Sequence, residues 1–340
     1  MKTKPIDIVI PWVDGDDSVW KKEKEAYLSE ATTLQRRCNK NNRFQSWDNL
    51  QYLFRSFEKC MPWVRKVFFV TWGHVPSFLN LKCEKLEIVN HEEFIPHQYL
   101  PTFNINTIEM NLHRIKDLSE NFIYFNDDVI PLKYHPETYF FKNDMICDEA
   151  VERIVAPRFL PEGDIMLSSY RAINNMCIIN KYFNKREVQR KNFFKWYNLK
   201  YGKNLLRNIA LHYFYDFDYI TNHHVAVALQ KSTYEKIWSL EPEILDATCK
   251  NKFRNYSDVN FYLIRIWNLC EGKFYPRKTK GKSFLVSDVN YERIADMIQR
   301  KEYPMICINE ASSITDFTVI KNRINSALER LFPEKSKFEL

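Results

Sequence analysis

The sequence predicts an α/β fold, with a Rossmann-like, mostly parallel sheet that carries helices on both faces and a largely helical C-terminal part. Short apolar runs alternate with amphipathic runs along the first part of the chain, as strands and helices do in such a sheet. Acidic turns follow two of the apolar runs, at the position where open α/β sheets bind their ligands. Helical patterns dominate the later sequence.

The individual elements follow from the spacing of the apolar residues. Uniformly apolar runs predict buried strands at 6–10, 64–71, 86–89 and 122–125. Helical spacing or polar helix-forming composition predicts helices at 17–37, 47–58, 106–115, 181–207, 226–240, 259–269 and 317–331. We expect three regions: 1–145 for nucleotide-sugar and metal binding, 146–285 with a basic helical insertion near 181–207, and a helical tail at 286–340.

Composition excludes several classes of protein. A chain of 340 residues with 45% hydrophobic content fills a core without disulfides or metal. Its 8 scattered cysteines form no C-x-x-C pair, which argues against structural zinc and favours reduced thiols in a cytosolic protein. The N-terminus lacks the apolar core of a secretory signal, no run of about 18 apolar residues occurs, and no glycine-rich phosphate loop is present.

The turn Asn126-Asp127-Asp128 follows the predicted strand 122–125. Two adjacent aspartates offer hard oxygen ligands that suit Mg²⁺ or Mn²⁺ carrying a diphosphate. An ordinary acidic turn is the alternative. Trp12 and Asp14 follow the first strand and belong at the same sheet edge, where they add a carboxylate and an aromatic face for a base.

Two downstream groups are candidates for the chemistry. His223 and His224 are adjacent, so in a helix at most one of them lines a site, and histidine is a natural general base. A surface or core histidine is the alternative. Arg254 and Asp258 stand four residues apart and suit either a phosphate clamp with a metal ligand or a helix-surface ion pair.

Basic and amphipathic segments leave a choice of partners. Residues 181–207 hold nine Lys or Arg and one acid, Glu187, interleaved with aromatics, and the formal charge of the chain is +7. This stretch suits nucleic acid, anionic polysaccharide or an acidic bilayer, or is a solvated helical face. The helix at 317–331 either lies on a membrane or docks on its own domain.

The run from Ile6 to Asp17, IDIVIPWVDGDD, resembles the first conserved block of the Stealth family of sugar-1-phosphate transferases. Members of this family make bacterial capsule and cell-surface polysaccharides, and one animal member, an N-acetylglucosamine-1-phosphotransferase, tags lysosomal enzymes. The second block is matched at 43–44, 62–66, 100–104, 112–115 and 124–128, and looser matches occur at 222–224, 231–232 and 253–258.

The resemblance implies a glycosyltransferase-A-like fold and transfer of a sugar-1-phosphate from a UDP-sugar to a glycan hydroxyl, which releases UMP and leaves a phosphodiester. The acceptor is an oligosaccharide or polysaccharide, with a lipid-linked form among the options, and nucleic acid is not a partner. The expected location is the cytoplasm, with peripheral contact at the inner face of the membrane as an option. Alternatives are a metal-dependent glycosyltransferase that releases UDP and a non-catalytic binding protein.

The resemblance also implies roles for single residues. The ligands of Mg²⁺ (or Mn²⁺) are Asp127, Asp128 and Asp258. The catalytic set is His224 as the base, favoured over His223 by its distance from Lys231-Ser232, with Asp128, Arg254 and Arg171. Substrate is bound by Trp12, Asp14, Arg43, Asn104, Arg114 and Asn126.

Overall fold

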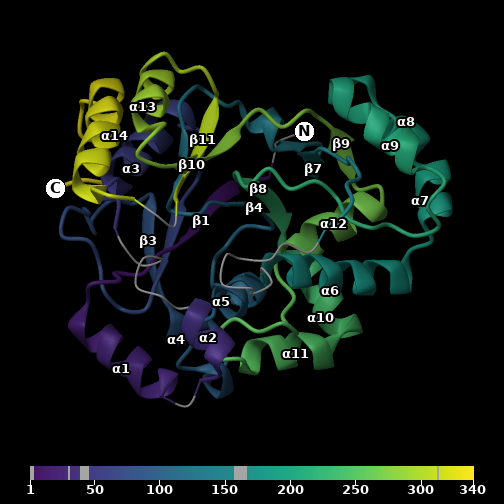
Figure 1. The fold of residues 1–340 in the computed structure, drawn as a ribbon, viewed down its shortest axis with the longest axis horizontal. Coiled ribbons are helices and arrows are strands. Elements are labelled where there is room, and N and C mark those ends of the chain that lie inside the picture. Colours follow the sequence, from purple (N-terminus) through teal and green to yellow (C-terminus); the bar gives the residue numbers. More distant parts are fainter. Residues whose placement is uncertain (1–3, 30, 39–45, 157–166, 312–313) are drawn as a thin grey trace.

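A computed structural model describes residues 4–29, 31–38, 46–156, 167–311 and 314–340, and a five-stranded sheet lies at its centre (Figure 1). The strands are β1 (Ile6–Pro11), β2 (Val67–Thr71), β3 (Leu86–Asn90), β4 (Asn121–Tyr124) and β8 (Val227–Gln230). They lie in the order β3-β2-β1-β4-β8, all parallel except β8, which runs antiparallel to β4. This confirms the predicted mostly parallel sheet.

The order of the strands reverses between β1 and β4. From β1 the chain steps outward to β2 and β3, then returns to the other side of β1 with β4. Val9 pairs with Tyr124, so the two strands end at the same edge of the sheet. Such a reversal opens a crevice beyond the carboxyl ends of the strands. The turns after β1 and β4 therefore both lie at this crevice.

Successive side chains of a strand point to opposite sides of the sheet. Because both sets are apolar and buried here, helices cover both faces. On one face, Phe125 and Phe69 contact Phe57 and Phe54 of α3 (Leu50–Cys60) at ring distances of 5.0 and 5.8 Å. On the other face Tyr124 lies over Phe261, with centroids 4.4 Å apart. The helices on that side are α5 (Ile105–Asn111), α10 (Lys231–Leu240), α11 (Pro242–Lys250) and α12 (Tyr262–Cys270).

A second sheet joins the C-terminal part of the chain to the turn after β4. It consists of β10 (Lys282–Val286), β11 (Met305–Glu310) and β5 (Val129–Pro131), and β5 begins directly after Asp128. The helices α13 (Tyr291–Gln299) and α14 (Phe317–Leu331) flank it. This confirms the largely helical C-terminal part, to which the structure adds the strand β11, which lies between these helices and pairs with β5.

The helix predicted at 226–240 is wrong in its first part. Residues 227–230 form β8, and the helix α10 starts only at Lys231. All four residues of β8 are buried beside β4, and a short apolar run in such a place is extended as readily as it is helical.

Further α-helices and strands lie outside these two sheets. They are α1 (Ser18–Leu28), α2 (Thr33–Cys38), α4 (His91–Phe94), the third sheet of β6 (Phe141–Lys142), β7 (Met145–Asp148) and β9 (Phe274–Pro276), and the helices α6 (Leu167–Tyr182), α7 (Lys185–Lys191), α8 (Phe193–Trp196) and α9 (Leu205–Leu211). A 3₁₀ segment at Leu199–Asn204 links the last two helices. The region 185–215, which we call the basic lobe, stands at the right edge of Figure 1.

A buried ion pair ties α12 to β7. The guanidinium of Arg265 donates to both carboxylate oxygens of Asp148, at 2.6 and 3.0 Å, and both side chains are buried. Burial acts to raise the pKa of Asp148, but the charge and hydrogen bonds of Arg265 bring it below its ordinary value. Arg265 also donates to the carbonyls of Thr221 and Glu149, so it fixes the segment that leads to His223 and His224.

We expect Arg265→Ala to lower the free energy of unfolding by about 3–5 kcal/mol, because it leaves a buried carboxylate without its partner. Urea denaturation followed by circular dichroism measures this change. The control is Lys250→Ala, which removes an exposed pair with Asp246 and should cost less than about 1 kcal/mol. Equal small losses in both variants would contradict the structural role of Arg265.

Candidate active site

The turn Asn126-Asp127-Asp128 leaves the end of β4 and enters β5. The amide of Val129 donates to the carbonyl of Asn126 at 3.1 Å, which closes the turn, and the amide of Ile308 on β11 donates to the carbonyl of Asp128 at 2.9 Å. The side chain of Asp127 is exposed, while those of Asn126 and Asp128 are half-buried. Two carboxylates are thus held on a braced backbone at the mouth of the crevice.

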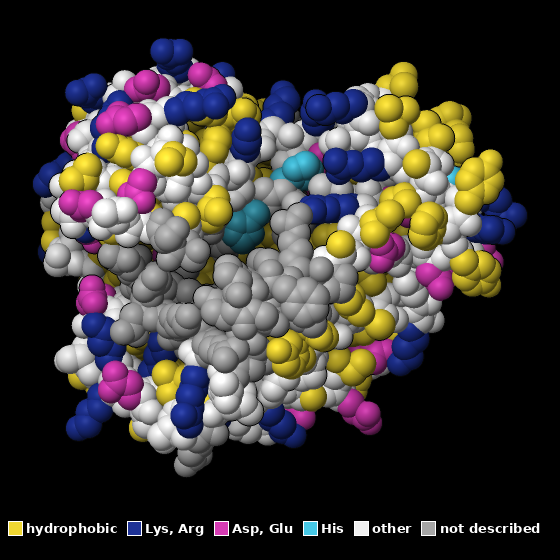
Figure 2. All heavy atoms as spheres, viewed as in Figure 1, with side chains coloured by type: hydrophobic (Ala, Val, Ile, Leu, Met, Phe, Trp, Pro, Cys, Tyr) yellow, Lys and Arg dark blue, Asp and Glu magenta, His cyan; other side chains and the backbone are white. Residues whose placement is uncertain are grey.

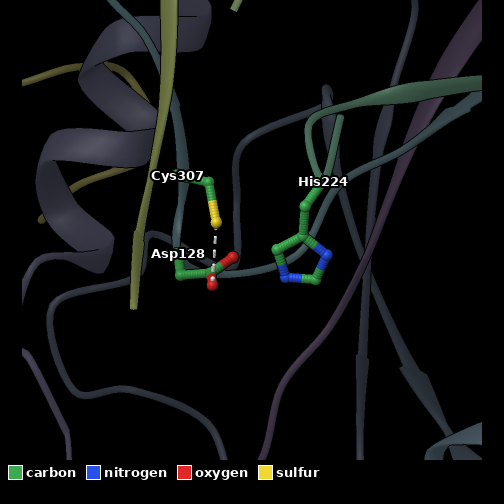
Figure 3. Close-up of side chains that lie close together, drawn as sticks. All are labelled: Asp128, His224 and Cys307. Carbon is green, nitrogen blue, oxygen red and sulfur yellow. Dashed lines mark hydrogen bonds between the residues drawn. The ribbon is translucent and has the colours of Figure 1, made fainter. Parts of the chain in front are cut away.

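Asp128 lies between a thiol and an imidazole that come from distant parts of the chain. One ligand atom each from Asp128, His224 and Cys307 lies within 4.8 Å of the other two. The thiol donates to Oδ2 of Asp128 at 3.2 Å, and Figure 3 shows the imidazole beside the carboxylate. Oδ1 of Asp128 is buried and has no hydrogen-bond partner among the residues that the structure describes.

Three carboxylates crowd this edge. Desolvation by the surrounding protein, with a smaller effect from the charge of Glu310, raises the pKa of Asp127 to about 6, although its side chain reaches solvent. Desolvation and then the charge of Asp127 raise the pKa of Asp128 to about 7. Glu310, at the end of β11, accepts from Nε1 of Trp47 at 3.2 Å. A divalent cation is the natural partner for carboxylates that repel one another in this way.

The two adjacent histidines face different neighbours. They lie on a loop before β8, not on a helix, and His224 has φ of +50° with its amide donating to Oδ1 of Asn222. Nε2 of His223 lies 3.0 Å from Oε2 of Glu149. The structure therefore brings His224, and not His223, beside Asp128. Burial, and then the charges of Arg171 and Arg254, lower the pKa of His224, so its imidazole is neutral at pH 7 and able to accept a proton.

Arg171 on α6 and Arg254, on the loop before α12, both act electrostatically on groups of this region. Their charges act on His224 and also on Glu109, a buried residue of α5. Burial raises the pKa of Glu109 to about 7, and its Oε1 accepts from the hydroxyl of Tyr124 at 2.8 Å. The sequence alone gave no reason to select Glu109 beyond its place near the start of a helix, and it gave none for Cys307 or Glu310.

Trp12 and Asp14 lie beyond the carboxyl end of β1, on the expected edge of the sheet. The ring of Trp12 meets the ring of His74 edge-on, with centroids 5.3 Å apart. The backbone amide of Asp14 donates to Nε2 of His74 at 2.7 Å, and Oδ1 of Asp14 accepts from the amide of Asp16. The second acidic turn is thus rigid and lies near the first.

Asp258 and Asn104 lie in a buried polar cluster instead of the carboxylate crevice. Asp258 is fully buried and accepts from the side-chain amides of Asn104, Asn106 and Asn251 and from the backbone amide of Asn255. The side-chain oxygen of Asn104, which is also fully buried, caps α5. These bonds hold the loop that carries Arg254 onto α5. They leave Asp258 outside the group formed by Asp128, His224 and Cys307, and the helix-surface ion pair considered for Arg254 and Asp258 does not form.

Arg114 does not reach the site. It is exposed, donates to Asn111, and packs over Trp238. The chain runs down α5 and enters β4 at Asn121, so Arg114 lies near the amino end of β4, at the opposite edge of the sheet from Asp127. Its role in substrate binding stays a prediction that this position does not favour. Arg43 lies outside the described residues.

We expect Asp258→Ala to lower the free energy of unfolding by about 2–4 kcal/mol in buffer with EDTA, because four donors lose their acceptor. Asp216→Ala, at an exposed carboxylate, should change it by less than about 1 kcal/mol. Chemical denaturation measures both variants. A loss for Asp258→Ala that appears only when Mg²⁺ is added would instead assign this residue to a metal site.

The double variant Asp127→Asn with Asp128→Asn should melt higher than the unaltered protein in metal-free buffer. Both carboxyls have a folded-state pKa above the ordinary value, so they favour the folded state while protonated and oppose it as they ionise. The difference in melting temperature should therefore grow from about pH 4, where the carboxyls of the unfolded chain ionise, to about pH 7, and stay level above it. A difference that shrinks as pH rises would contradict the crowding of these carboxylates.

Two family models match the chain. They are Stealth protein CR1, conserved region 1, over residues 4–31, and Stealth protein CR2, conserved region 2, over residues 43–148. The second covers β2 to β7 and includes the turn with Asp127 and Asp128.

Curated relatives match nearly the whole chain. The capsular polysaccharide phosphotransferase WcwK of Streptococcus pneumoniae is 41% identical over 335 residues, which is 98% of each chain. The exopolysaccharide phosphotransferase cps2G of Lactiplantibacillus plantarum is 32% identical and covers 98% of this chain and 96% of its own. The receptor polysaccharide phosphotransferase WefC of Streptococcus gordonii is 31% identical over 98% of this chain and 99% of its own.

Among solved structures, the galactosyltransferase LgtC in complex with donor and acceptor sugar analogs covers 97% of this chain and 98% of its own. The TM-score is 0.38 and the sequence identity 11%, a likeness on which no conclusion about the site rests.

Proposed function

This chain belongs to the Stealth family and is a phosphotransferase, and from that premise we propose that it transfers a sugar-1-phosphate from a UDP-sugar to a hydroxyl of a capsular or other cell-surface polysaccharide. The relatives named as polysaccharide phosphotransferases support the class of product. The observation that carries the proposal is the pair Asp127 and Asp128 with His224 beside it, beyond the carboxyl ends of the paired strands β1 and β4.

The proposed reaction exchanges one phosphorus–oxygen bond for another. The acceptor oxygen attacks the phosphorus that carries the sugar, and the bond from this phosphorus to the oxygen bridging to the second phosphorus breaks. UMP leaves with the bridging oxygen, and the acceptor keeps the sugar-1-phosphate as a phosphodiester. His224 takes the acceptor proton, for which a half-buried neutral imidazole is suited.

Asp127 and Asp128 would hold Mg²⁺ or Mn²⁺. The residues fit such an ion, because Oδ1 of Asp128 lacks a partner among the described residues and both carboxylates have raised pKa values that a cation would reverse. When bound, the ion neutralises charge on the diphosphate. The metal role of Asp258 stays a prediction that its amide partners do not favour.

The remaining residues orient the donor and balance its charge. Arg171 and Arg254 place positive charge around the site of His224, where it stabilises the phosphoryl group during transfer. Trp12 and Asp14 bind the nucleotide end, and Asn126 faces the donor beside them. Cys307 stays a thiol, because burial and then the charge of Asp128 raise its pKa far above the ordinary value. Transfer is therefore direct, without a cysteine intermediate.

The proposed donor and acceptor also suggest a location. A UDP-sugar donor would place the reaction in the cytoplasm, and a lipid-linked acceptor would bring it to the inner face of the membrane.

Incubation of the purified protein with a panel of UDP-sugars, an oligosaccharide acceptor and Mg²⁺ should release UMP and no UDP. Ion-exchange separation of the nucleotides measures this outcome. EDTA should stop the release, and Asp127→Ala or Asp128→Ala should slow it by about 100-fold or more, because the ion then has too few ligands. UDP as the nucleotide product would overturn the proposal in favour of a glycosyltransferase.

The adjacent histidines provide a matched pair of variants. We expect His224→Asn to lower kcat by about 10²–10⁴-fold through loss of the base, and His223→Asn to lower it by less than about tenfold. Asparagine is chosen because it tolerates the positive φ at position 224. Steady-state kinetics with both substrates saturating measures kcat. Equal effects in the two variants would remove His224 as the base.

A further inference from the structure

The basic lobe exposes an unusual number of large apolar side chains. Eight residues within one short stretch expose at least half of their surface to solvent: Phe193, Phe194, Leu199, Leu206, Ile209, Tyr213, Phe214 and Tyr215. Phe194, Leu199 and Tyr213 are exposed by 83, 87 and 84%. Figure 2 shows apolar side chains gathered along the right edge, where Figure 1 places α7, α8 and α9. We call these eight residues the apolar patch.

The apolar patch is not the face that holds the lobe to the protein. That face consists of other residues: Trp196 and Tyr201 are fully buried, and Asn208 donates to the carbonyls of Ala150 and Trp196. Lys185 is also buried, in an ion pair with Glu152 at 2.7 Å. The lobe thus has an inner face that anchors it and an outer face that is apolar toward water. An exposed apolar surface of this extent marks an interaction site.

Positive charge borders the patch. The exposed cations of the lobe are Arg186, Arg190, Lys191, Lys200, Lys203 and Arg207. The exposed acids are Glu187 within the lobe and Asp216 directly after it. The guanidinium of Arg186 lies over the ring of Tyr215, with 6.0 Å to the centroid. Figure 2 shows further Lys and Arg side chains between the apolar edge and the histidine side chains near the middle of the molecule.

We propose that the basic lobe docks on an anionic lipid bilayer through the apolar patch. The aromatic and leucine side chains enter the interface between headgroups and acyl chains, and the bordering cations meet the headgroup phosphates. Within the described residues no helix is long and apolar enough to cross a membrane, so the contact is with the bilayer surface. An acidic polysaccharide would satisfy the cations but offers little to Leu199, Leu206 and Ile209.

Short links join the docked lobe to the proposed active site. Asn208 accepts from the amide of Glu152, and the amide of Thr221 donates to the carbonyl of Val151 at 2.7 Å. Thr221 stands three residues before His224. If the proposed transfer is correct, docking therefore holds the base in a fixed relation to the bilayer and favours an acceptor attached to lipid. The docking itself does not depend on that function.

Vesicle flotation tests the proposal on the full chain. The protein should float with vesicles of phosphatidylcholine and phosphatidylglycerol, bind weakly to phosphatidylcholine alone, and lose binding as salt is added. The triple variant Phe194→Ser, Leu199→Ser and Tyr213→Ser should lower the bound-to-free ratio by about tenfold or more, because it removes the most exposed side chains of the apolar patch.

The matched control replaces exposed apolar residues elsewhere, Leu81→Ser with Val289→Ser, which are exposed by 62 and 93% and should leave binding unchanged. A charge variant, Lys200→Glu with Lys203→Glu, should remove the preference for anionic vesicles. The proposal is overturned if the triple variant binds as the unaltered protein does, or if neither vesicle type is bound while an acidic polysaccharide is. UMP release is not the readout, so failure here leaves the proposed reaction untouched.

Discussion

The parallel pairing of β1 with β4 is the constraint on which the rest of the structure depends. Because β2 and β3 lie on the other side of β1, this pair marks the point where the order of strands reverses, and the loops beyond it open a crevice. Both strands are buried throughout, so a shift of one residue in their pairing would exchange every side chain between the two helix-covered faces. The register that pairs Val9 with Tyr124 therefore also places the acidic turns after β1 and β4 together.

Residues from distant parts of the chain complete the candidate site at this edge of the sheet. Cys307 and Glu310 arrive on β11, His224 on the loop before β8, and Arg171 and Arg254 from the helical part. Burial and then the charge of Asp127 raise the pKa of Asp128, whereas burial and then the charges of two arginines lower the pKa of His224. In the proposed reaction the same region would hold a cation and supply a neutral base, as a phosphoryl transfer to a hydroxyl requires.

The sequence predicted the features that arise from local pattern. The helix at 317–331 has its predicted bounds, and the buried strands with their acidic turns lie where apolar runs end. Features that depend on distant contacts were not predictable. The run 227–230 is extended because β4 lies beside it, and Cys307 meets Asp128 across 179 positions of the chain. Asp258 resembled a metal ligand by spacing, but its surroundings of side-chain amides are visible only in three dimensions.

The position of β11 has a consequence for how the protein is made. The turn with Asp127 and Asp128 is translated in the first half of the chain. Cys307, which donates to Asp128, and Glu310, whose charge acts on Asp127, are translated near the end. A nascent chain that has not yet reached Met305 holds two crowded carboxylates on a turn that lacks its bracing hydrogen bond from Ile308. This side of the site is therefore completed only late in translation, after the residues of the apolar patch have been made.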